Sequence, residues 1–162
     1  MLPRPSTIWH GCTRNKVATL KLNSFQSGPA TTGRARRCGW FDAVLARQAC
    51  WLNSVTSLCV TKLDVLDGLE EIMICTGYRF NGVETDRPPW DSSGLTRCEP
   101  VYESLPGWAT STGGVRSFDH LPVEAKNYLA RIESLMGVPI DVISTGADRE
   151  ETVILKNPFG TT

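Results

Sequence analysis

The run LPVEAKNYLARIESLMGVPIDVIS, residues 121–144, constrains the fold most strongly, because one helical pattern leads directly into one strand pattern. Its first part repeats apolar side chains at intervals of three and four residues, the spacing of one helix face. Pro122 suits the first turn, Gly137 suits the C-terminal cap, and Pro139 cannot continue a helix. The short apolar segment PIDVIS is typical of a buried strand. Helix and strand in direct succession predict an α/β fold.

The segments before this run repeat the alternation. Residues 41–53 place apolar side chains on one helical face, with Asp42 in the first turn, where the helix dipole favours an anion. VTSLCVTKL (55–63) and EIMICTGYRF (71–80) are rich in β-branched and apolar residues and predict two strands. Asn81–Gly82, followed by VETD, predicts a hairpin.

The remaining segments complete a partial, mostly parallel sheet with flanking helices. Residues 101–105 and 152–156 predict further short strands, and residues 86–100, rich in proline, serine and glycine, predict a loop. Residues 1–29 contain two early prolines and no sustained period. We expect them to form a divergent N-terminal segment, either disordered or carrying a short strand at 17–22.

Charge and cysteine content exclude several classes of function. The chain has 17 Lys and Arg against 17 Asp and Glu, which argues against a nucleic-acid coat or a polybasic membrane surface. The six cysteines form no C-x-x-C pair, so we expect no zinc site. The sequence opens with no signal-peptide pattern and has no apolar run of membrane length. We therefore expect a cytoplasmic protein with reduced thiols.

The first candidate site is the turn TTGRARR, which begins at Thr31. Arg34 and Arg36 are two residues apart, so in an extended loop both guanidinium groups point the same way. Together with the hydroxyls of Thr31 and Thr32 they suit a carboxylate or a phosphate. The alternative is a solvated basic loop with no ligand.

Two further candidates follow predicted strands, where ligands bind in open α/β sheets. In TKLD, the stem of Lys62 can lie on a flat ring, and Asp64 can accept two hydrogen bonds from one ring edge. Guanine presents two such donors and adenine does not. In STG, residues 144–146, backbone N–H groups can hold a base carbonyl or a phosphate. The alternatives are a surface ion pair and an ordinary turn.

These motifs do not occur independently. In this order, ATTGRARRCGWFDAV, TKLDVLDGL, EPVYESLPGW, NYLARIESLMGVPIDVISTGADREET and NPF closely resemble the carboxy-terminal portion of adenylosuccinate synthetase. The resemblance implies one domain over residues 30–162, equivalent to the C-terminal part of a larger P-loop-like synthetase fold. The family's enzymes join IMP and L-aspartate at the expense of GTP, in the first committed step of AMP biosynthesis.

The resemblance also implies residue roles. The loop that closes over aspartate would be Ala30, Thr31, Thr32, Gly33, Arg34, Ala35 and Arg36. Arg34 would also approach IMP, and Arg36 would reach the GTP phosphates. The GTP site would be completed by Lys62, Leu63, Asp64, Ser144, Thr145 and Gly146, with Asp64 selecting GTP over ATP.

Other parts of the family's machinery have no counterpart in this sequence. The catalytic base, the catalytic histidine and the Mg²⁺ ligands belong to the family's amino-terminal part, so we expect no catalytic or metal-binding residue in this chain. The expectation is a family member that is inactive alone. Three alternatives stay open: a non-catalytic guanine-nucleotide-binding module, one half of a complementing pair, and a nonfunctional gene remnant that folds poorly. The family's enzymes are homodimers, so dimerisation is a further expectation.

Overall fold

The computed structural model describes residues 39–87, 94 and 97–157. The predicted strand at 17–22 and the proposed boundary between residues 29 and 30 lie outside these ranges. The chain divides into two compact units, the first of residues 1–45 with 73–103 and the second of residues 46–72 with 104–162. Each unit is described by itself.

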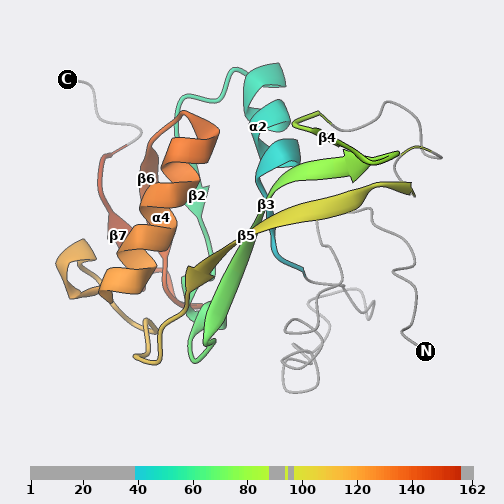
Figure 1. Ribbon diagram of the computed structural model, residues 1–162. Helices are drawn as coiled ribbons and strands as arrows, with labels where there is room; N and C mark the ends of the chain where they lie inside the picture. Colours follow the sequence, from blue (N-terminus) through green and yellow to red (C-terminus); the bar gives the residue numbers. More distant parts are fainter. Residues whose placement is uncertain (1–38, 88–93, 95–96, 158–162) are drawn as a thin grey trace, which may run out of the picture. The chain divides into compact units, whose positions relative to one another are not determined.

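The first unit is built on the long strand β3 (Figure 1). Its sheet contains β1 (Phe41–Asp42), β3 (Glu71–Phe80), β4 (Val83–Thr85) and β5 (Glu99–Pro106). Strand β1 runs parallel to β3, β4 runs antiparallel to it, and β5 pairs with it as well. The last residues of β5 and the first residues of β3 belong to the second unit.

The predicted hairpin between β3 and β4 is confirmed. Phe80 pairs with Val83 across the two-residue turn, in antiparallel register. Asn81 and Gly82 both have positive φ angles, 51° and 81°. This is the backbone conformation of a type I′ turn, whose twist matches that of the flanking strands. An Asn-Gly pair adopts it at low cost, which is why the dipeptide predicted it.

Asp42 joins the sheet of the first unit to helix α2 (Ala43–Leu52). Its Oδ1 accepts a hydrogen bond from Leu45 N at 3.0 Å, so Asp42 caps the helix rather than lying in its first turn. Its Oδ2 accepts a 2.5 Å hydrogen bond from the hydroxyl of Tyr78. The helix begins at residue 43, later than predicted, because residues 41 and 42 pair with β3 instead. The small core beside them consists of Val44, Cys75, Tyr78 and Cys98, with Phe80 and Tyr102 packed against it.

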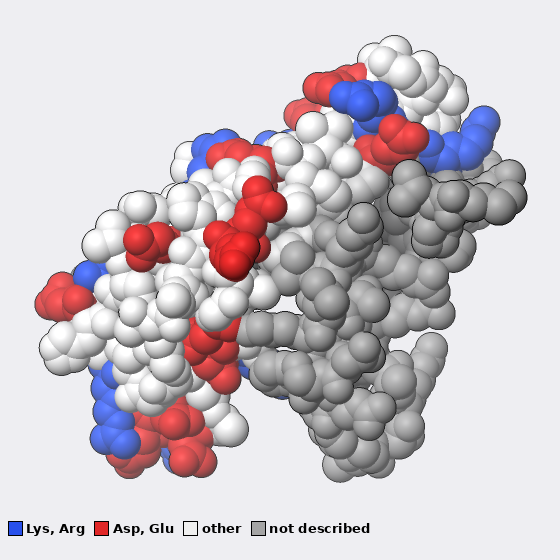
Figure 2. All heavy atoms as spheres, turned by 60° about the horizontal axis from the view of Figure 1, so that its bottom comes forward, with Lys and Arg blue, Asp and Glu red and all other residues white. Residues whose placement is uncertain are grey.

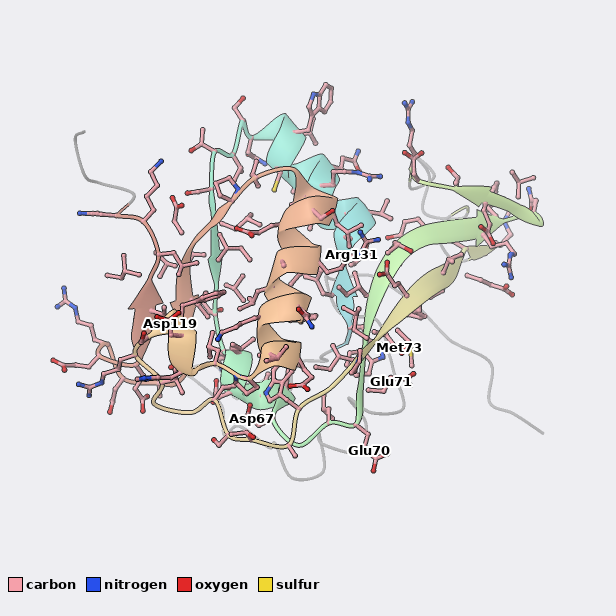
Figure 3. All side chains as sticks on the ribbon, turned by 60° about the vertical axis from the view of Figure 1, so that its left-hand side comes forward. Asp67, Glu70, Glu71, Met73, Asp119 and Arg131 are labelled. Atoms are coloured by element: carbon pink, nitrogen blue, oxygen red, sulfur yellow. The ribbon has the colours of Figure 1, made fainter. Side chains whose placement is uncertain are left out.

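The second unit combines a three-stranded sheet with helix α4, which lies along the sheet in both ribbon views (Figures 1 and 3). Its elements are β2 (Leu58–Val60), the 3-10 helix η1 (Leu63–Leu66), the 3-10 helix η2 (Phe118–His120), α4 (Val123–Met136), β6 (Ile140–Ser144) and β7 (Thr152–Ile154). The predicted helix is confirmed, and it ends at Gly137 in the left-handed conformation, φ 70°. Its buried face is Ala125, Tyr128, Leu129, Ile132 and Met136.

The prediction of a mostly parallel sheet is not confirmed. Both sheets are mixed, since β2 and β6 are parallel while β6 and β7 are antiparallel, as are β3 and β4. The physical reason lies in the connections. Strands β3 and β4 are joined by two residues, and β6 and β7 by seven, whereas parallel neighbours need a crossover of a dozen or more.

Candidate functional site

The two candidate segments that follow β2 and β6 meet at one edge of the second unit's sheet. Strands β2 and β6 are parallel neighbours, with Val60 opposite Ile143. The segment Lys62–Asp64 begins two residues after Val60, and Ser144–Gly146 begins directly after Ile143. Since parallel strands end at the same edge of a sheet, the pairing brings together two segments about 80 residues apart in the chain.

Lys62 bends the chain sharply as it leaves β2. It has φ 60° and ψ 46°, the left-handed conformation that costs a residue with a Cβ about 1–2 kcal/mol. Leu63, the next residue, is 1% exposed, so it anchors η1 in the core. Lys62 itself is exposed. The bend therefore leaves the Lys62 side chain in solvent while Leu63, the next residue, is buried.

Asp64 carries the most informative atom of the site. Its Oδ1 is shielded from solvent and has no hydrogen-bond partner among the described residues. A buried acceptor left without a donor costs about 1–3 kcal/mol, and more when it is charged. Buried polar groups in native proteins are nearly all hydrogen-bonded, so an exception needs an explanation. A ligand that brings its own N–H donor to this oxygen would supply one.

The turn after β6 is held together internally. Thr145 is fully buried, and its hydroxyl donates to the carbonyl of Val115 at 2.8 Å. Its N–H donates to the carbonyl of Glu151 at 2.9 Å. The hydroxyl of Ser144 donates to the carbonyl of Gly146 at 2.9 Å. The Thr145 N–H, expected as one of the turn's free donors, is thus used within the protein.

The Glu151 carboxylate lies in the space that a side chain at position 146 would occupy. A Cβ on Gly146 would lie 2.0 Å from Glu151 Oε2, the oxygen that accepts a 2.9 Å hydrogen bond from Asp148 N. The carboxylate thus crosses the backbone of Gly146 at close range. A larger residue there would force Glu151 to give up its bond to the turn.

The patterns missed Asp67, at the C-terminal end of η1. Its carboxylate accepts four hydrogen bonds from residues 108–112, an extent that the turn motif LDG does not predict. Trp108, one of the donors, is 3% exposed, and its ring centroid lies 6.0 Å from that of Tyr128. An acid in a turn is usually solvated, so no sequence signal distinguishes this one.

The arginine-rich loop, residues 30–36, lies outside the described residues. The structure begins just beyond it, where Trp40 is 5% exposed and its indole N–H has no hydrogen-bond partner among the described residues. Within those residues no group of three or more His, Cys, Asp or Glu side chains could hold a metal ion.

Comparison with known proteins identifies the family. The family model described as adenylosuccinate synthetase matches residues 15–153. The chain belongs to the adenylosuccinate synthetase family. Adenylosuccinate synthetase 2 of Chromobacterium violaceum is 54% identical over 146 residues, and the adenylosuccinate synthetase of Alcanivorax borkumensis is 58% identical over 130 residues.

The match covers most of this chain but only part of its relatives. It spans 90% of the chain and 34% of the Chromobacterium protein, and 80% of the chain and 30% of the Alcanivorax protein. The solved structure of fully ligated adenylosuccinate synthetase from Plasmodium falciparum superimposes with a TM-score of 0.80 at 32% identity, over 95% of this chain and 36% of that one. The chain thus spans about a third of the length of these synthetases.

The surface of this family member carries both signs of charge. On the face shown in Figure 2, acidic and basic side chains of the described residues are interspersed. Within the described ranges, no helix is long and apolar enough to cross a membrane.

Proposed function

We propose that the sheet edge formed by Lys62–Asp64 and Ser144–Gly146 binds the guanine base of GTP. The observation that carries the proposal is Asp64 Oδ1, a shielded carboxylate oxygen without a donor. Family membership supports it, because both segments lie within the matched residues 15–153. The parallel pairing of β2 and β6 supports it as well, since it sets both segments at one edge.

The chemistry of the base explains the choice of guanine. Guanine carries a ring N–H and an exocyclic amino group on the same edge, and an ionised carboxylate accepts from both. Adenine has an acceptor nitrogen where guanine has the ring N–H. That nitrogen and the Asp64 carboxylate would both be acceptors, so they would repel each other instead of forming a hydrogen bond. A site that leaves its buried polar group unpaired discriminates strongly against the wrong ligand.

The neighbouring residues take complementary roles. The exposed stem of Lys62 can cover a face of the base while its ammonium group stays in water. Leu63 is too deeply buried for its side chain to reach a ligand, so it would serve through its backbone. Thr145 is fully buried, and its N–H and hydroxyl are bonded within the protein, so it would hold the turn in place. Gly146 leaves room for the Glu151 carboxylate that holds the turn.

We place this subsite in the ligation of IMP and L-aspartate with GTP as the energy source, the reaction implied by the family resemblance. The chain would correspond to the carboxy-terminal portion of the synthetase. Thr31, Thr32 and Arg34 would meet aspartate, Arg34 would also meet IMP, and Arg36 would meet the GTP phosphates. The resemblance places the Mg²⁺ ligands in the family's amino-terminal part, so we assign no step to a metal in this chain.

The proposed state of the protein follows from the same resemblance. The chain alone would bind nucleotide without turning it over, since no base or metal ligand is assigned to it. In the cell it would act in the cytoplasm, as part of a dimer. Restored turnover on mixing with the amino-terminal portion of a relative would identify it as a complementing half.

Calorimetric titration of the purified chain with GTP, ITP and ATP tests the proposal. ITP lacks only the 2-amino group of GTP, so it isolates one of the two proposed hydrogen bonds to Asp64. We expect the affinity to fall from GTP to ITP by about 1–3 kcal/mol and to fall further for ATP. Equal affinity for all three nucleotides would mean that the edge does not recognise the base.

A further inference from the structure

Asp67 is held by donors from a single segment. Its Oδ1 accepts from Trp108 Nε1 at 2.7 Å and from Thr112 Oγ1 at 2.8 Å. Its Oδ2 accepts from Ser111 Oγ at 3.0 Å and from Thr112 N at 2.7 Å. Figure 3 labels Asp67 where η1 ends, beside the connection that follows β5. One carboxylate thereby fixes residues 108–112 to η1.

The same hydrogen bonds extend to both halves of the proposed guanine subsite. On one side, Asp67 N donates to the carbonyl of Asp64 at 3.2 Å. On the other, Val115 N donates to the carbonyl of Thr112 at 3.2 Å, and the carbonyl of Val115 accepts from the hydroxyl of Thr145 at 2.8 Å. Both threonines are fully buried, so water does not compete for the bonds of their hydroxyl groups.

We infer that Asp67 is a positioning residue for base recognition, an inference that rests on the proposed function of the edge. The described pairing between β2 and β6 ends at Val60 and Ile143, before either segment of the subsite begins. Beyond it, the path from Asp64 through Asp67 and residues 108–115 to Thr145 sets the spacing of the two halves. Hydrogen-bond recognition of a ring edge depends on that spacing, because such bonds weaken steeply with distance and angle.

Asp67 acts through other residues and not on the base itself. Both of its oxygens are occupied by protein donors. The Asp67→Asn variant keeps the size but replaces one acceptor oxygen by an N–H₂ donor. If the amide nitrogen takes the place of Oδ1 it faces Trp108 Nε1, and if it takes the place of Oδ2 it faces Thr112 N. Both of these groups are donors, so one hydrogen bond is lost in each orientation. The carboxylate is therefore needed for its charge and its two acceptors.

The first test compares the GTP and ITP affinities of the wild-type chain, Asp67→Asn and the control Asp119→Asn by calorimetry, at a temperature where all three are folded. Asp119 is an exposed acid of the same unit, labelled in Figure 3. We expect the ratio of GTP to ITP affinity to fall at least about fivefold in Asp67→Asn and to stay unchanged in the control. A lower melting temperature with an unchanged ratio would reduce Asp67 to a structural role and overturn the inference.

The second test needs no nucleotide. Amide hydrogen exchange over residues 144–148 should quicken in Asp67→Asn, while helix α4 keeps its protection. Loosening confined to residues 108–115 would overturn the coupling. If Asp67→Asn does not fold, Thr145→Val cuts the same path at its far end, and an unchanged ratio of GTP to ITP affinity in that variant would contradict the inference.

The two tests separate this inference from the proposed function. Equal binding of GTP and ITP by the wild-type chain would reject the guanine subsite. Hydrogen exchange would still show whether Asp67 and residues 144–148 are coupled.

Discussion

The hydroxyl of Tyr78 donates a 2.5 Å hydrogen bond to Asp42, whose other oxygen caps helix α2 through Leu45 N. Tyr78 is fully buried and Asp42 is 9% exposed, so the pair lies in the core of the first unit. One carboxylate thus joins the start of a helix to the C-terminal part of the longest strand, across 36 residues of sequence.

The variant Tyr78→Phe tests this link. Removing the hydroxyl leaves Asp42 Oδ2 without its donor, and we expect a loss of about 1–3 kcal/mol in the free energy of unfolding. Urea denaturation of the single variants and of the double variant Tyr78→Phe/Asp42→Asn measures it. The double variant should lose less than the sum of the two single variants, because a neutral amide is cheaper to leave unpaired. Strict additivity would mean that the two side chains do not interact.

The close approach of Gly107 to the backbone of Leu69 leads to a second prediction about stability. A Cβ there would lie 1.9 Å from the backbone oxygen of Leu69, which cannot move without displacing the chain. We expect Gly107→Ala to lower the free energy of unfolding by about 2–3 kcal/mol. The matched control is Gly113→Ala, whose nearest neighbour would be Ser111 Oγ at 3.3 Å, and which should change stability by less than about 0.5 kcal/mol. Similar effects of both substitutions would contradict the close approach.

Alkaline pH should destabilise the second unit through Tyr128. Burial raises the pKa of Tyr128 from 10.0 to about 12. Between these values the unfolded chain releases the phenol proton and the folded chain retains it, so stability is full below pH 10 and falls as the pH rises. From pH 8 to pH 10.5 this contributes a loss on the order of 1 kcal/mol.

The variant Tyr128→Phe removes this contribution, whatever its effect at pH 8. Urea unfolding at both pH values should show a smaller alkaline loss in the variant than in the wild-type chain. Burial raises the pKa of the Cys75 thiol to about 12 in the same direction, with a contribution from Asp42, so part of the loss should remain. An identical alkaline loss in both proteins would exclude Tyr128 as a source.

Because Lys62 has a left-handed backbone, replacing it with glycine should change the stability of the fold and the affinity for GTP in opposite directions. Lys62→Gly should raise the free energy of unfolding by about 0.5–1 kcal/mol, because glycine adopts φ 60° without a Cβ clash. It should also weaken GTP binding, since the side chain that we propose covers the base is lost. Ser54→Gly, at φ 51°, should bring a similar gain in stability and leave binding unchanged. Weakened binding in both variants would point to a general effect of backbone flexibility.

Local signals account for the elements that the sequence predicted well. The Asn81–Gly82 turn, the helical period before Gly137, and the strand at β6 each depend on a few neighbouring residues. The start of α2 and the mixed sheets could not be predicted in the same way. Both depend on which strands pair, and the partners of β1 and β2 lie tens of residues away in the chain.

The candidate site shows the same division. Lys62–Asp64 and Ser144–Gly146 could be picked out because each follows a strand pattern. The sequence pattern alone did not show that β2 and β6 are neighbours, nor that Asp64 Oδ1 lacks a partner. The bond between Asp67 and Thr112 spans 45 residues and has no local signature.

The binding of GTP and XTP to wild-type and Asp64→Asn chains tests most directly whether Asp64 recognises the guanine edge. Xanthine keeps the ring N–H but carries a carbonyl oxygen in place of the 2-amino group. The amide of asparagine can accept from the first and donate to the second. We predict that the wild-type chain prefers GTP and that Asp64→Asn prefers XTP. A variant that loses or retains affinity for both nucleotides equally would contradict the assignment.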